Sequence, residues 1–142
     1  MNQITTQYVT EGGACYEQYV ITDPAAKTAL TITPERGGMI TGFTLDGDEY
    51  IWTRRPNFSE CNRPRFGVPV LFPSCGNPDG GVHMFDGKAY PMETHGFADL
   101  CAWEVESVGP DGVTLILEST PLTKFLYPFD FTLLVNYNLD GN

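Results

Sequence analysis

The stretch FDFTLLVNYNL at residues 129–139 carries the clearest structural signal in the chain. Apolar side chains occupy every second position, and mostly polar ones stand between them. The apolar set is Phe129, Phe131, Leu133, Val135, Tyr137 and Leu139. Because successive side chains of a β-strand point to opposite faces, this alternation predicts a strand with one face in a core and the other in contact with water.

Several other segments also read as strands. Residues 112–120 (GVTLILEST) place alternate apolar side chains together, and shorter strands are predicted in TALTIT (28–33), MITGFTL (39–45), EYIW (49–52) and LCAWEVESV (100–108). Asp-Gly pairs occur at 46–47, 79–80, 86–87, 111–112 and 140–141, and each can supply the positive φ angles of a type I′ hairpin turn. No window of helical length keeps a clean helical period. The sequence therefore predicts an all-β fold, an antiparallel β-sandwich, as one unit over residues 1–142.

Composition limits the classes of partner. The 142 residues carry a formal net charge of −10, which repels nucleic acid and anionic lipid, so we expect neither a nucleic-acid nor a membrane partner. The polar opening lacks the basic flank and apolar core of an export signal, and no stretch approaches the roughly 20 apolar residues of a spanning helix. We expect a soluble, cytoplasmic protein.

The metal-binding and redox side chains are sparse. Cys15, Cys61, Cys75 and Cys101 lie far apart and form no CxxC pair. The sequence has two histidines. The cysteine spacing favours free thiols in a reducing compartment. With so few potential ligands, we expect no metal site.

Two segments interrupt the strand pattern. RRPNFSECNRPR at residues 54–65 gathers four of the eight basic residues: Arg54, Arg55, Arg63 and Arg65. Such a cluster can hold an anion or orient a polar ligand, although composition alone favours a solvated loop that balances nearby acids. The following stretch, FGVPVLFPSCGNPDGG at 66–81, is dense in proline and indicates a rigid loop or bulged edge.

The second interruption is YPMETHGFADLCAWEV at residues 90–105. His95 precedes Gly96, which lets the backbone approach a ligand closely. His95 can present its imidazole to a pocket, or it can be a satisfied structural residue. His83 stands just before a predicted hairpin turn, where we expect an exposed strand residue.

The order of these elements resembles a known family. GDEYIW, RPRFGVPVLFPSCGN, GVHMFDGKAYPMETHGFADLCAWEV and YPFDFTLLVNYNL contain the ordered set G-x-P-x-L-F-P, G-K-x-Y and H-G-F. Over residues 30–142 the chain resembles the N-terminal half of the aldose 1-epimerase (galactose mutarotase-like) family, nearest its hexose-6-phosphate epimerase-like branch. The resemblance implies a supersandwich whose concave face binds a hexose or hexose phosphate. It also implies interconversion of the α and β anomers by a general acid and a general base, without metal or organic cofactor.

The resemblance also implies site residues. His95 matches the histidine that hydrogen-bonds the sugar near its reacting end, and Arg65 resembles an arginine that contacts sugar hydroxyls. The predicted substrate-binding set is Arg63, Arg65, Asn77 and His95, with His95 positioning the substrate. Asn77 and Asp99 stand where related proteins carry arginines, so Asp99 would remove a positive charge from the rim of the site. A phosphate would then depend on the four arginines of residues 54–65.

The resemblance places the family's acid histidine and carboxylate base in later segments than this chain contains. Residues 129–139 also lead into an Asp-Gly turn with no return strand. We expect either the N-terminal half of a longer domain or a sandwich completed by another chain, for example in a homodimer. The alternatives in function are a noncatalytic carbohydrate-binding module and a structural β-sandwich that serves assembly.

Overall fold

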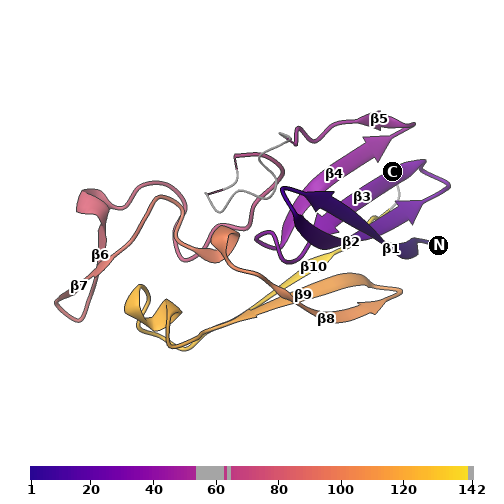
Figure 1. The fold of residues 1–142 in the computed structure, drawn as a ribbon. Helices are drawn as coiled ribbons and strands as arrows, with labels where there is room; N and C mark the ends of the chain where they lie inside the picture. The colour runs from indigo at the N-terminus through magenta and orange to yellow at the C-terminus, as the bar shows by residue number, and fades with distance from the viewer. Residues whose placement is uncertain (54–62, 64, 141–142) are drawn as a thin grey trace.

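A computed structural model describes residues 1–53, 63 and 65–140, and these residues confirm the all-β prediction. The first sheet is antiparallel, with strands in the order β1-β2-β3-β4-β5 (Figure 1). Its strands are β1 (Gln3–Glu11), β2 (Ala14–Asp23), β3 (Thr28–Thr33), β4 (Met39–Leu45) and β5 (Asp48–Glu49). The predicted strands at 28–33 and 39–45 are confirmed, whereas in EYIW only the first residue lies in a strand.

The second sheet has the order β10-β9-β8 and contains the strongest sequence signal. Its strands are β8 (Glu104–Gly109), β9 (Gly112–Glu118) and β10 (Thr132–Tyr137). The pairs Leu133–Leu117, Val135–Leu115 and Tyr137–Val113 place the apolar positions of β10 and β9 side by side on one face of the sheet. The strand is shorter than predicted, and Phe129 at its approach is 43% exposed.

The core lies between the two sheets, as a sandwich requires. Ile21, Leu30 and Ile32 come from the first sheet, and Val113, Leu115 and Leu117 from the second. Trp103 and Ala98, which lead into the second sheet, join the same cluster. Burying each large aliphatic side chain contributes about 1.5–3 kcal/mol, so this interior is the main source of stability.

A third, two-stranded sheet stands apart from the sandwich. Strands β6 (Val82–Phe85) and β7 (Lys88–Pro91) form a hairpin that projects away from the two larger sheets (Figure 1). Phe85 connects this hairpin to the body through ring contacts with Tyr127 and Phe129, at centroid distances of 5.5 and 5.1 Å.

The Asp-Gly prediction holds at two of its five positions. Asp46-Gly47 and Asp86-Gly87 have positive φ at both residues, as a type I′ turn requires. Between β8 and β9 the turn is instead Pro110-Asp111, and Gly112 pairs with Gly109. Gly112 has φ of 107°, and a Cβ there would collide with the Tyr137 carbonyl oxygen. The pair at 79–80 lies in a 3-10 turn (Asp79–Gly81), and the pair at 140–141 extends beyond the described residues.

Sequence reasoning missed the first hairpin. β1 and β2 pair over nine positions and are joined by Gly12-Gly13, both with positive φ. The Gly-Gly pair between segments rich in Thr, Tyr and Val was the available signal. In the part of the chain that is described, no helix has the length and apolarity to cross a membrane.

Candidate functional site

A pocket of about 820 Å³ lies where Arg63 and the segments 65–81 and 92–99 meet. All four predicted substrate-binding residues line it: Arg63, Arg65, Asn77 and His95. Apolar side chains such as Leu71 and Met92 complete the walls. This volume lies within the usual range for small-molecule sites, roughly 300–1,000 Å³.

The H-G-F element forms a tight backbone crossing beneath the pocket. His95 and Gly96 have φ of 68° and 77°, a left-handed conformation that is costly for a residue with a Cβ. A Cβ on Gly96 would overlap the Phe72 carbonyl oxygen, which accepts hydrogen bonds from the N–H groups of Phe97 and Ala98. Position 96 therefore requires glycine. The close approach of the two backbone segments also fixes the position of the His95 Cα, from which its side chain extends.

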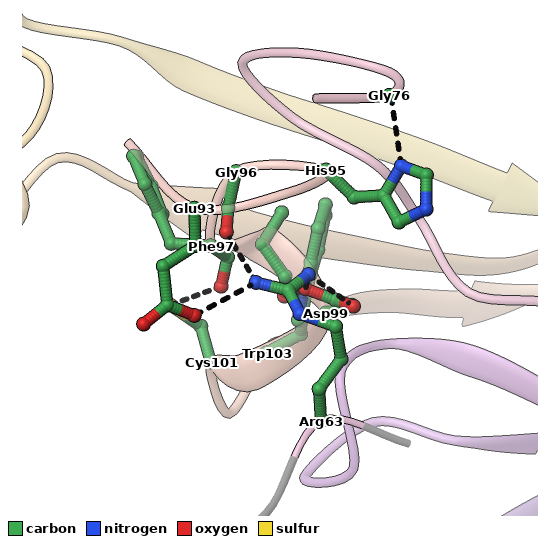
Figure 2. A network of polar contacts seen from close by, with 10 residues as sticks. Arg63, Gly76, Glu93, His95, Gly96, Phe97, Asp99, Cys101 and Trp103 are labelled. Carbon is green, nitrogen blue, oxygen red and sulfur yellow. Dashed lines mark hydrogen bonds and ion pairs between the residues drawn. The ribbon is translucent and has the colours of Figure 1, made fainter. Parts of the chain in front are cut away.

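Two hydrogen bonds to one glycine orient His95. The Gly76 N–H donates to His95 Nδ1 over 2.8 Å, and the His95 N–H donates to the Gly76 carbonyl over 2.9 Å (Figure 2). Because Nδ1 accepts a hydrogen bond from a backbone amide, the ring proton of the neutral imidazole resides on Nε2. Figure 2 shows Nε2 on the side of the ring away from Gly76. His95 therefore presents a hydrogen-bond donor with a defined direction.

Arg63 is held within the wall of the pocket. Its Nη1 lies 2.6 and 2.7 Å from the two carboxylate oxygens of Asp99, and its Nη2 donates to the Gly96 carbonyl over 2.6 Å. Glu93 Oε2 lies 3.6 Å from the same Nη2 (Figure 2). Arg63 is thus brought to the site as predicted, but its guanidinium is engaged with protein groups and aligns the H-G-F segment.

Asp99 differs from the sequence expectation. Its side chain is 1% exposed, so it lies buried in the wall of the pocket and not on the rim. Burial raises the pKa of the Asp99 carboxyl, and the Arg63 guanidinium opposes that rise. The carboxylate therefore serves as the buried counterion of Arg63, a pairing between residues 36 positions apart.

The remaining predicted residues lie on the open rim. Arg65 is exposed, and among the described residues no ion pair or hydrogen bond engages its side chain. Asn77 is exposed as well, and its Oδ1 accepts a hydrogen bond from the Thr94 hydroxyl. Arg65 thus offers guanidinium donors to a ligand, and Asn77 offers its amide N–H groups.

Glu93 was missed by sequence reasoning. Its side chain is 81% exposed and lines the pocket two residues before His95. The turn between them is closed by the hydrogen bond from the Gly96 N–H to the Glu93 carbonyl, 3.1 Å long. The available signal was the acidic residue in M-E-T-H-G-F. Glu93 adds a hydrogen-bond acceptor to the donors of His95 and Arg65.

The other residues singled out in the sequence lie elsewhere. His83 is in β6, as predicted, but it is half-buried instead of exposed, because its ring packs on Phe85 with centroids 5.8 Å apart. Arg54, Arg55 and Cys61 lie outside the described residues. Cys15, Cys75 and Cys101 are free thiols. Across residues 1–53, 63 and 65–140, no group of three or more His, Cys, Asp or Glu side chains is arranged to hold a metal ion.

Comparison with known proteins agrees with the fold and the motifs. Residues 17–142 match the family model described as aldose 1-epimerase. The chain belongs to the aldose 1-epimerase family. Protein LacX of Lactococcus lactis subsp. lactis is 28% identical over 111 residues, which are 74% of this chain and 36% of that protein.

Solved structures extend this likeness to three dimensions. The Slr1438 protein from Synechocystis sp. PCC 6803 has a TM-score of 0.82 and 33% identity, over 87% of this chain and 44% of that one. A galactose mutarotase related enzyme from Lactobacillus acidophilus has a TM-score of 0.68 and 25% identity, over 97% of this chain and 40% of that one. This aldose 1-epimerase family chain therefore has the galactose mutarotase-like fold and spans less than half the length of these relatives.

Proposed function

We propose that this chain supplies the sugar-binding part of an aldose 1-epimerase and that its pocket binds a neutral hexopyranose. The observation that supports this most directly is the fixed orientation of His95. A pyranose presents a ring of hydroxyl groups and an apolar C–H surface, and the pocket offers both polar and apolar contacts to such a ligand.

His95 acts on the substrate as a positioning donor. Its Nδ1 already accepts from Gly76, so the Nε2–H can hydrogen-bond a sugar oxygen near the anomeric carbon. Loss of that proton would leave an anionic imidazolate, and gain of a second proton would break the bond to Gly76. The arrangement therefore suits hydrogen bonding better than proton transfer.

Interconversion of the anomers requires two proton transfers, one to a base and one from an acid. A base removes the proton from the anomeric hydroxyl and an acid protonates the ring oxygen, so that the ring opens, the aldehyde rotates and the ring closes on its other face. Asp99 is paired to Arg63 and His95 is held as a donor, so among the described lining residues Glu93 is left as an exposed carboxylate, with no second group to act as the acid. We therefore expect this chain alone to bind hexose without accelerating mutarotation.

The charge balance of the pocket favours a neutral hexose over a hexose phosphate. Arg63 and Arg65 are offset by Glu93 and Asp99 among the described lining residues. The Arg63 guanidinium is paired with Asp99, so a bound phosphate would interact mainly with Arg65 among the described arginines of the pocket.

Calorimetry and polarimetry test this proposal together. We expect glucose or galactose to bind the wild-type chain, glucose 6-phosphate to bind no more tightly, and His95→Ala to weaken hexose binding about tenfold, the loss of one well-placed hydrogen bond. His83→Ala, with a histidine outside the pocket, is the matched control. Polarimetry of freshly dissolved α-glucose should show no acceleration. An acceleration abolished by His95→Ala would show that this chain carries its own acid and base, and unchanged binding in His95→Ala would refute the site.

A further inference from the structure

We propose that a second hollow, beside the pocket, binds another pyranose ring, so that the preferred ligand is a disaccharide with a free reducing end. The proposal rests on the function proposed above, because the reducing-end ring would occupy the His95 pocket. The second hollow has a volume of about 310 Å³. Arg65 and Pro69 line both cavities, so the second hollow adjoins the first.

Two exposed aromatic side chains form the distinctive part of this hollow. Trp52 is 66% exposed and Tyr50 is 62% exposed, and both line it together with Phe66. Scattered exposed apolar residues are common on proteins. Here two large rings, two positions apart, line one hollow that adjoins the His95 pocket. The other tryptophan, Trp103, is 2% exposed in the core.

The backbone that carries these rings is anchored on both sides. The Tyr50 N–H donates to the Phe43 carbonyl over 2.8 Å, and the Gly67 N–H donates to the Trp52 carbonyl over 3.1 Å. The Thr53 hydroxyl donates to the Thr41 carbonyl over 2.7 Å. The rings are therefore exposed although their main chain is held, which lowers the entropic cost of binding a ligand against them.

The chemistry of the hollow fits a neutral sugar ring. An aromatic face removes the apolar C–H face of a pyranose from water, while the hydroxyls at the ring edge remain solvated or hydrogen-bonded. Arg65 stands at the shared wall, where its guanidinium can donate to the oxygen atoms near the link between two rings. Arg65 is also the only charged residue among those that line this hollow in the described part of the chain, so a multiply charged ligand would find a single counterion there.

Paired titrations of monosaccharides and disaccharides test the proposal. Calorimetry would compare lactose with galactose and maltose with glucose on the wild-type chain, Trp52→Ala and Trp52→Phe. We expect the disaccharides to bind about five- to tenfold more tightly, as partial burial of one apolar ring face would produce. Trp52→Ala should remove this advantage and leave monosaccharide affinity unchanged, and Trp52→Phe should retain most of it. Tyr8→Ala, which removes a 68% exposed ring on β1, is the matched control.

The outcomes separate the two proposals. Equal affinity for monosaccharide and disaccharide, with binding still dependent on His95, would overturn the second subsite and leave the proposed function standing. Disaccharide binding that depends on Trp52 but not on His95 would support the second hollow and refute the first pocket. Absence of binding by either class would refute both. Acrylamide quenching adds a direct readout, because disaccharide should protect the exposed Trp52 while Trp103 is already shielded.

Discussion

The wall and the rim of the pocket use the same residue type in opposite ways. Arg63 belongs to the wall, where its 20% exposed side chain pairs with Asp99. Arg65, two residues later, belongs to the exposed rim. A buried charge must be paired, whereas an exposed charge is solvated by water and stays available to a ligand. We therefore expect changes in the wall to alter stability and changes on the rim to alter affinity.

The largest effect should come from breaking the wall. Arg63→Ala leaves the Asp99 carboxylate buried without its counterion, and we expect the free energy of unfolding to fall by about 3–5 kcal/mol. Urea denaturation followed by tryptophan fluorescence measures this loss. Replacing both partners, Arg63→Met with Asp99→Leu, should recover most of the stability, because no unpaired charge remains. If Arg63→Ala lowered the free energy of unfolding by less than Arg65→Ala does, the distinction between wall and rim would be wrong.

Tyr137 of β10 stabilises a turn that packs against the segment containing Asp99. Its hydroxyl donates to the Gly38 carbonyl over 2.5 Å, and the Gly37 N–H beside it donates to the Cys101 carbonyl, so β10 holds the turn that packs against residues 98–103. Burial raises the pKa of Tyr137 from its usual 10 to about 12. The folded state therefore holds this proton more tightly than the unfolded state, and the associated stability is lost as the pH rises from 10 through 12.

For Tyr137 we expect an alkaline loss of up to about 2–3 kcal/mol that Tyr137→Phe lacks. Denaturation curves at pH 9 and at pH values up to 12 would compare the two proteins. At neutral pH the variant should lose about 1 kcal/mol for its missing hydrogen bond. The same alkaline slope in both proteins would assign the effect to other groups.

The smallest effect on stability should come from the rim. Arg65→Ala removes an exposed guanidinium with no partner among the described residues, so we expect unfolding to change by less than about 0.5 kcal/mol. Its affinity for hexose should fall about tenfold, as expected for a lost charge-assisted hydrogen bond. His83→Ala provides the comparison in calorimetry. Equal losses of affinity in Arg65→Ala and His83→Ala would show that the rim does not select the ligand.

Much of the fold follows from short-range patterns. The alternation of residues 129–139 predicts the core face of β10, and Asp46-Gly47 and Asp86-Gly87 mark two of the hairpins. The motif order places His95 and Arg65 beside one pocket. The first hairpin was missed because β1, with three Thr and two Gln among its nine residues, lacks a strong apolar face. The turn before β9 was shifted by one residue because Gly112 is needed against Tyr137 and not in the turn itself.

The roles of the site residues depend on contacts between segments that are far apart in the chain. Local sequence patterns do not predict such contacts. Strand periodicity and turn residues act over a few positions, so all-β architecture and the buried face of β10 can be read from residue order alone. The pairing of Arg63 with Asp99 and of His95 with Gly76 joins segments 36 and 19 positions apart. Packing of the sheets brings those segments together, and burial then turns one arginine into a structural ion pair while leaving the other open to a ligand. The physical reason is that side-chain desolvation depends on what surrounds a residue in space, and sequence neighbours supply only part of that environment.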